Sequence, residues 1–239
     1  YTSGCYSIVD GKGIGGSKAL KRDIKNDGQL KATSLNDGAE LLRVDSNTVY
    51  SVKFNYYIET KGSDLKVSMV TAGSQGHWSG TRKDDYPSFA VDQTAVGTWQ
   101  TMEYYLSLGN LGTSNCAYFS MEGGTGGLLY VDNIEITKLF GTNEEKGMLV
   151  VDYGNGTVEK FEGNVGDPVT LNIPDRSAES MTLDGWYSDA DLTTGISAPA
   201  AISKGVNFAY AKWKTETQTA TKAVITFEDM PEYLMKNTG

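Results

Sequence analysis

The chain of 239 residues carries 30 acidic and 21 basic side chains, and its formal net charge of −9 argues against nucleic acid and anionic membranes as partners. No apolar run approaches the roughly 18 residues that cross a bilayer, and the first residues show no signal pattern of basic then apolar residues. We therefore expect a soluble protein, cut from a longer chain because it starts at Tyr1 rather than Met. Its 28 Gly, set between short alternating runs, predict an all-β fold.

The first predicted elements are a strand at residues 5–9 and a glycine-rich turn at residues 11–16. That turn lacks the Gly-Lys-Ser/Thr ending of a phosphate-binding loop, so we interpret it as a connection between strands. Two cysteines, Cys5 and Cys116, permit one disulfide, and two small buried thiols are the equal alternative.

A long strand is predicted at residues 49–58, where apolar and polar side chains alternate. One face is predicted to be core and the other to meet water or a ligand; the core face has Val52, Phe54, Tyr56 and Ile58, and the other has Lys53, Asn55, Tyr57 and Glu59. Further strands follow at residues 65–71, 99–106 and 117–121, and a long polar segment at residues 72–88 separates the first two of these. Segments of this length without structure of their own are more often functional than tight turns are.

The strand at residues 128–139 alternates with period two and contains one unusual residue. The pattern predicts Leu128, Tyr130, Asp132, Ile134 and Ile136 on one face, with Leu129, Val131, Asn133, Glu135 and Thr137 on the other. Asp132 would then lie on a core face, where a carboxylate must be paired, hydrogen-bonded or bound to a cation.

Four motifs in this order resemble the jelly-roll carbohydrate-binding modules of bacterial glycan-degrading and surface proteins. They are Gly-Ser-Lys-Ala-Leu at 16–20, Val-Tyr-Ser-Val-Lys-Phe-Asn-Tyr at 49–56, Gly-Thr-Trp-Gln-Thr at 97–101 and Tyr-Val-Asp-Asn-Ile-Glu-Ile at 130–136. The resemblance covers residues 1–140 and implies a two-sheet sandwich. It fixes the fold better than the ligand, because the same architecture also serves as a spacer.

Residues 147–214, after a linker at 141–146, are similar to the internalin-type B-repeats of bacterial surface proteins. The similarity lies in Leu-Asp-Gly-Trp-Tyr-Ser-Asp at 183–189 and Phe-Ala-Tyr-Ala-Lys-Trp at 208–213. It implies a small ubiquitin-like β-grasp domain in which Trp186 and Trp213 are core residues rather than a ligand platform.

The tail has a polar linker at residues 215–222 and a predicted strand segment at 223–239 that contains Phe-Glu-Asp at 227–229. In the jelly-roll modules such a strand opens the domain, yet residues 1–140 begin downstream of it. We expect the tail strand to complete the sandwich, either by folding back onto its own chain or by strand exchange with a neighbouring copy. Both arrangements imply tandem repeats in the parent protein.

The resemblance also implies a structural calcium ion, held by the carboxylate of Glu228, the carbonyl of Lys18 and the carboxylate of Asp132. Oxygen ligands of these kinds suit calcium. The alternative is that Asp132 hydrogen-bonds to backbone groups of the glycine-rich turn.

A glycan would stack on aromatic rings and hydrogen-bond to polar side chains beside them. The candidate residues are His77, Trp78, Arg82, Tyr86, Tyr57 and Tyr105. Catalysis is not expected: one His and no nucleophile motif are present, and the adjacent carboxylates at 84–85 and 144–145 are typical of solvated turns.

The sequence thus predicts an all-β jelly-roll sandwich plus a small β-grasp domain, from an extracellular protein that is secreted or attached to the cell wall. The predicted function is non-catalytic binding of a polysaccharide, with the second domain as a spacer. The alternative is a purely structural stalk or adhesin repeat without a sugar site.

Overall fold

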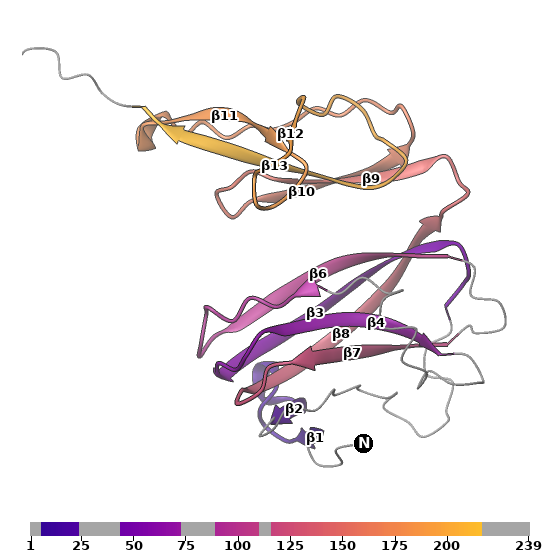
Figure 1. Ribbon diagram of the computed structural model, residues 1–239, viewed down its shortest axis with the longest axis vertical. Helices are drawn as coiled ribbons and strands as arrows, with labels where there is room; N and C mark the ends of the chain where they lie inside the picture. Colours follow the sequence, from indigo (N-terminus) through magenta and orange to yellow (C-terminus); the bar gives the residue numbers. More distant parts are fainter. Residues whose placement is uncertain (1–5, 24–43, 73–88, 110–115, 217–239) are drawn as a thin grey trace, which may run out of the picture. The chain divides into compact units, whose positions relative to one another are not determined.

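The computed structural model describes residues 6–23, 44–72, 89–109 and 116–216 (Figure 1). Nearly all regular structure in these ranges is β, and the strands form three sheets. The chain divides into two compact units between Met148 and Leu149, with residues 162–167 and 201–207 grouped with the first unit. No helix within these ranges is long and apolar enough to cross a membrane.

The N-terminal unit contains two sheets. Five antiparallel strands form one in the order β1-β2-β8-β3-β6: β1 (Tyr6–Val9), β2 (Ala19–Asp23), β8 (Leu128–Gly141), β3 (Thr48–Thr60) and β6 (Trp99–Leu108). Three antiparallel strands form the other in the order β5-β4-β7: β5 (Phe89–Ala90), β4 (Leu65–Ala72) and β7 (Cys116–Gly123). The predicted turn between the first two strands is present, with a short 3₁₀ segment at Ile14–Gly16.

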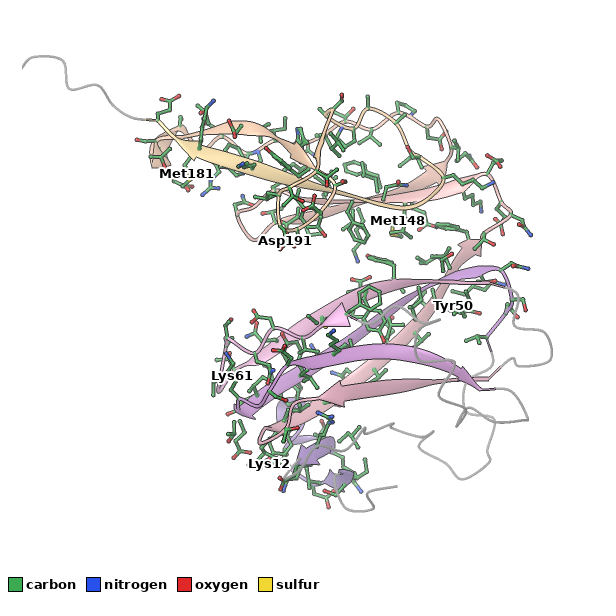
Figure 2. All side chains as sticks on the ribbon, viewed as in Figure 1. Lys12, Tyr50, Lys61, Met148, Met181 and Asp191 are labelled. Atoms are coloured by element: carbon green, nitrogen blue, oxygen red, sulfur yellow. The ribbon has the colours of Figure 1, made fainter. Side chains whose placement is uncertain are left out.

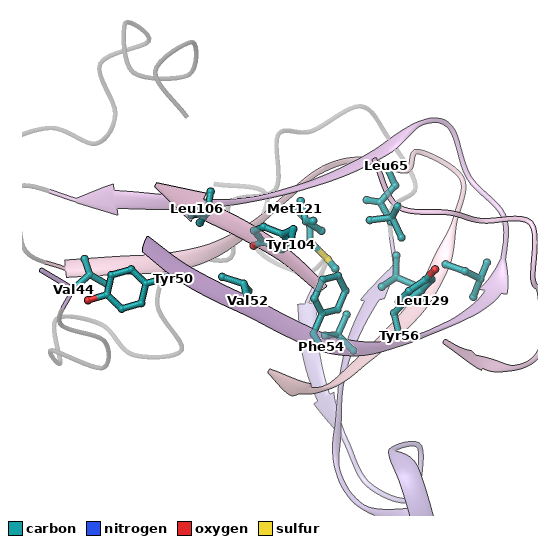
Figure 3. Close-up of a cluster of buried hydrophobic side chains, with 14 of the residues drawn as sticks. Val44, Tyr50, Val52, Phe54, Tyr56, Leu65, Tyr104, Leu106, Met121 and Leu129 are labelled. Carbon is teal, nitrogen blue, oxygen red and sulfur yellow. The ribbon is translucent and has the colours of Figure 1, made fainter. Parts of the chain in front are cut away.

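Apolar side chains from both sheets form one core (Figure 3). β3 supplies Val52, Phe54, Tyr56 and Ile58, the residues predicted from its alternation, and none of them is more than 5% exposed. The other sheet supplies Leu65, Val67 and Met121. Each large apolar side chain buried in this way stabilises the fold by roughly 1.5–3 kcal/mol. The predicted β-sandwich is therefore confirmed.

The predicted faces of β8 are confirmed for residues 134–137 but wrong for residues 128–132, because the strand contains a β-bulge between them. Asn55 of β3 pairs with Asp132, but Lys53, only two residues away, pairs with Glu135. The extra residue in β8 is accommodated at Asn133, whose φ of 51° is left-handed, a conformation that Asn tolerates better than most residues.

The bulge reverses the alternation of β8 at its centre. Leu129 and Val131 lie in the core before the bulge, and Ile134 and Ile136 pack against the core after it. Asp132 and Tyr130 therefore lie opposite the outward-facing residues of β3, on the side away from the core. Asp132 is not a core carboxylate, and the prediction failed because period-two reasoning assumes an unbroken ladder.

The C-terminal unit holds most of a second five-stranded sheet, in the order β10-β9-β13-β11-β12. Its strands are β9 (Lys146–Asp152), β10 (Val158–Asn164), β11 (Met181–Tyr187), β12 (Gly195–Ile196) and β13 (Gly205–Thr215). The helical structure described in this unit is a single 3₁₀ turn at Ser177–Glu179.

Trp186 is a core residue of the C-terminal unit, as predicted, whereas Trp213 is only half-buried. Trp186 is 5% exposed and makes an edge contact with Tyr153, with ring centroids 5.9 Å apart. The indole N–H of Trp213 donates to the carbonyl of Tyr153 at 2.7 Å, and the Arg176 guanidinium lies 5.1 Å over its ring. Both indoles are therefore engaged by groups of their own unit.

Candidate functional site

Tyr57 and Tyr105 are the predicted ligand-contacting residues that the structure describes. Tyr57 lies in β3 and Tyr105 in β6, and both are half-buried. The other four candidates, His77, Trp78, Arg82 and Tyr86, lie outside the described residues, as do Cys5 and the predicted calcium ligand Glu228. The site is therefore built on the sheet that carries β3 and β6.

One side of the sheet β1-β2-β8-β3-β6 points away from the core of the N-terminal unit. We call this side the outer face. Since Phe54 and Tyr56 point into the core, Asn55 and Tyr57 point outward. The register then places Trp99 of β6 beside Tyr57 on one side and Tyr130 of β8 beside it on the other.

Trp99, Tyr57 and Tyr130 form an aromatic row across three strands of the outer face. The Tyr57 ring centroid lies 5.7 Å from that of Trp99 and 6.1 Å from that of Tyr130, with the planes tilted by 54° and 57°. Tyr57 and Trp99 are half-buried, whereas Tyr130 is only 5% exposed. Of the three rings in this row, Tyr57 and Trp99 therefore supply most of the accessible surface.

Tyr130 is fixed at both its hydroxyl and its ring. The hydroxyl donates to Glu59 Oε2 at 2.6 Å, and this hydrogen bond, together with burial, raises the pKa of Tyr130 to about 12. The Lys12 ammonium lies 5.3 Å over the ring centroid, within the range of a cation–π contact. Tyr130 is thus the least accessible ring of the aromatic row, and we call its end of the row the closed end.

A polar band runs across the outer face beside the aromatic row. Asn55 donates through Nδ2 to Thr101 Oγ1 at 2.8 Å, and Asn133 donates through Nδ2 to Asn55 Oδ1 at 3.2 Å. The Asn55 and Thr101 pair lies two residues along the strands from the Tyr57 and Trp99 pair. Amide and hydroxyl groups therefore lie next to two accessible rings, a combination suited to a hydroxyl-rich ligand with apolar faces.

Tyr105 does not join this cluster. It lies opposite Ser51, and its hydroxyl and that of Ser51 both donate to Glu103 Oε1, at 3.0 and 2.8 Å. Six residues separate it from Trp99 along β6, a distance of about 20 Å in a strand. The structure thus separates Tyr57 and Tyr105, which the sequence reasoning had grouped.

Asp132 anchors the glycine-rich turn to the outer face. Its Oδ2 accepts hydrogen bonds from the backbone N–H of Ile14 and from Ser17 Oγ, both at 2.9 Å, and its Oδ1 accepts from the backbone N–H of Asn133 at 2.8 Å. Partial burial opposes ionisation of Asp132, but these three donors outweigh it and hold the pKa of the carboxyl below its usual value. The contact with Ile14 is of the kind predicted as the alternative to calcium.

The same region offers oxygen atoms of the kinds that bind calcium. A Cβ added to Gly13 would lie within 2.7 Å of three of them, Asp132 Oδ2, the Lys18 carbonyl oxygen and Ser17 Oγ. A carboxylate, a carbonyl and a hydroxyl thus converge on one point beside a glycine, which fits the donor preference of calcium. No group of three or more His, Cys, Asp and Glu side chains suited to a metal occurs among the described residues.

Glu144 and Glu145 are turn residues, in agreement with their interpretation from the sequence. Glu144 Oε1 accepts from the Gly141 N–H at 2.9 Å, Glu145 forms an ion pair with Lys204, and both glutamates are exposed. They do not face one another across a cleft as the carboxylates of a glycosidase do.

The sequence analysis missed Trp99, Tyr130 and Lys12. Trp99 shares the odd-numbered face of β6 with Tyr105, so the alternation that selected Tyr105 could also have selected Trp99. Tyr130 was assigned to the core because the bulge at Asn133 leaves no clear trace in the apolar pattern. Lys12 carries no local signal, since its place over Tyr130 depends on the folding of the turn.

Several solved structures are similar to this chain, whereas no protein-family model and no curated protein sequence matches it. A family 16 carbohydrate-binding module is 14% identical, with a TM-score of 0.39, over 57% of this chain and 87% of that one. The xylan-binding CBM22-1 domain of Paenibacillus barcinonensis Xyn10C is 15% identical, with a TM-score of 0.36, over 56% and 80%.

A third similar structure is a carbohydrate-binding module of Cellvibrio mixtus lichenase 5A in complex with cellotriose. It is 15% identical, with a TM-score of 0.36, over 57% of this chain and 89% of that one.

Proposed function

We propose that the N-terminal unit is a non-catalytic glycan-binding module of the jelly-roll type, and that the outer face binds the sugar. The observation that carries this proposal is the half-buried pair Tyr57 and Trp99 beside the hydrogen-bonded band of Asn55 and Thr101. Sugar rings have apolar faces that stack on such rings, and their hydroxyls bond to such amides and hydroxyls.

Affinity gel electrophoresis of the full chain tests this proposal. We expect one or more soluble polysaccharides, among them xylan, galactan and β-glucan, to retard the wild-type protein. A Tyr57→Ala, Trp99→Ala double variant should lose this retardation, because stacking rings behave as hot spots whose removal costs at least about tenfold in affinity.

The matched control is Tyr187→Ala, which removes a half-buried aromatic residue of β11 in the other unit. This variant should bind like the wild type. If no polysaccharide retards the wild type, the proposal is wrong and the purely structural stalk is the better description.

Calcium is proposed as a structural ligand of the same unit. Asp132 and the carbonyl of Lys18 would hold it together with Glu228, and the convergence of oxygens beside Gly13 supports this assignment. Its role would be to neutralise the carboxylates and to fasten the glycine-rich turn. A chelator should then lower the melting temperature and added calcium should restore it, because an ion that binds only the folded state stabilises it by mass action.

The C-terminal unit is proposed to be a B-repeat with a β-grasp fold that acts as a spacer in an extracellular, cell-wall-attached or secreted protein. The packing of Trp186 supports a structural role for this unit. The tail at 223–239 is proposed to complete the sandwich in its own chain or in a neighbouring copy. Deletion of 223–239 should therefore lower the melting temperature of the N-terminal unit, and unchanged melting would contradict the role of the tail.

A further inference from the structure

The turn between β1 and β2 brings a cation to the aromatic row. Lys12 lies in this turn, next to β2 (Figure 2), and its side chain is exposed although its ammonium stacks on the Tyr130 ring at 5.3 Å. Within the described part of the chain, no carboxylate forms an ion pair with Lys12, whereas Lys18 in the same turn pairs with Asp10 at 3.4 Å. The N–H donors of Lys12 that point away from the ring are therefore available to a ligand.

The backbone position of Lys12 is set by the turn. The N–H of the next residue, Gly13, donates a hydrogen bond to the Ser17 carbonyl at 2.8 Å. The N–H of Gly16 donates to the Gly13 carbonyl at 3.0 Å. Asp132 then fastens the turn to β8 through Ile14 and Ser17. These bonds fix the backbone beside Lys12 close to Tyr130, and the Lys12 ammonium contacts the Tyr130 ring from there.

The charges around Tyr130 balance one another. The Glu59 carboxylate accepts a hydrogen bond from the Tyr130 hydroxyl at 2.6 Å. Lys21 lies opposite Tyr130 in the register and forms an ion pair with Asp23 at 3.4 Å. With Lys12 there are thus two cations and two carboxylates. An acidic sugar would meet the carboxylates as well as the ammonium, whereas a neutral sugar needs only hydrogen bonds.

We infer that Lys12 is a specificity-determining residue of the glycan surface, which donates hydrogen bonds to the hydroxyls of a neutral sugar stacked on Tyr57 and Trp99, and that Asp132 acts as the positioning residue that holds it there. The inference rests on the proposed function. It adds a ligand-contacting residue outside the strands and gives the anchored turn a role in binding.

The test compares Lys12→Met with Lys12→Arg, using a neutral polysaccharide that retards the wild type. Met keeps an apolar chain against Tyr130 but has no N–H donor, and a hydrogen bond to a charged group contributes enough that we expect about tenfold weaker binding. Arg keeps a cation and its donors, so it should stay within about twofold of the wild type. Because Lys12 is exposed, neither change should lower the melting temperature.

Gly13→Ala provides the second arm. Its Cβ would lie 2.6 Å from Asp132 Oδ2 and 2.7 Å from the Lys18 carbonyl oxygen, so the turn must move. We expect this variant to weaken binding as much as Lys12→Met does, and the double variant to be no weaker than either, since both remove the same contact.

The possible failures are distinct. In the first, Lys12→Met binds like the wild type while the Tyr57→Ala, Trp99→Ala variant loses retardation. This result would overturn the inference and leave the proposed function intact. Fully additive effects of Lys12→Met and Gly13→Ala would refute the positioning role of the turn. If the wild type binds no polysaccharide at all, the proposed function and this inference both fall.

Discussion

Aromatic side chains contact one another in each unit, but their surroundings differ. In the C-terminal unit the Tyr153 hydroxyl donates to Glu159 and accepts from the Asn172 N–H, and Trp186 packs against its ring. On the outer face of the N-terminal unit, Tyr57 and Trp99 contact each other but keep part of their rings accessible. Aromatic content alone therefore does not mark a candidate ligand surface. The two sets of rings differ in whether the protein's own groups already cover them.

The largest expected effect is loss of stability on removing a covered ring. Trp186→Ala should reduce the free energy of unfolding of the C-terminal unit by about 3–5 kcal/mol, because it leaves a cavity in a packed core. Trp99→Ala should cost the N-terminal unit about 1 kcal/mol or less, since the indole is only half-buried. Denaturant unfolding of both variants measures this contrast, and equal losses would erase the distinction between the two sets of rings.

Acid provides the next test, through two carboxylates that each fasten a turn. The pKa of Asp132 is held below its usual value against partial burial by donors from Ile14, Ser17 and Asn133, and that of Asp189 in the C-terminal unit is lowered to about 2, chiefly by the Thr193 N–H. A lowered pKa in the folded state adds stability that is complete above the ordinary pKa of about 4 and is lost as the pH falls through the folded value.

The corresponding measurement is melting temperature against pH for Asp132→Asn and Asp189→Asn. Each variant should melt below the wild type by a constant amount above about pH 5, and the gap should close as the carboxylate protonates in the wild type. Only Asp132→Asn should also weaken glycan binding at neutral pH. A loss of binding in both variants would contradict the special role of the turn at Gly13.

The smallest expected effect concerns two tyrosines that each donate to a glutamate at 2.6 Å. The pKa of Tyr130 is raised to about 12 chiefly by the hydrogen bond to Glu59, whereas that of Tyr153 is raised to about 12 chiefly by burial, with Glu159 second. Glu59→Gln should therefore move the pKa of Tyr130 most of the way back toward about 10, and Glu159→Gln should move that of Tyr153 less.

Ultraviolet difference titration of the two variants checks this expectation. Because both pKa values lie above the ordinary value, the stability that each neutral tyrosine contributes is complete below about pH 10 and is lost as the pH rises through about 12. Equal shifts of the pKa in both variants would contradict the distinction between Tyr130, held chiefly by its hydrogen bond, and Tyr153, affected chiefly by burial.

Local sequence was sufficient wherever side chains follow the regular geometry of one strand. The alternation of residues 49–58 correctly separated the core residues Phe54 and Tyr56 from the outward-facing Asn55 and Tyr57. The same reasoning failed at residues 128–132, because the left-handed Asn133 inserts one extra residue and turns Asp132 and Tyr130 outward. A bulge of this kind depends on the register between β8 and its neighbour β3, and no pattern within β8 alone reveals it.

The all-β class and the two-sheet core of the N-terminal unit could be predicted from the sequence, since they follow from the period and composition of single segments. The burial of Trp186 was implied by the resemblance to B-repeats. The structure was needed to show that Trp99 lies beside Tyr57, that Tyr105 lies apart, and that Lys12 reaches Tyr130. These neighbours are fixed by strand register and by one anchored turn, which join residues up to 118 positions apart, as between Ile14 and Asp132.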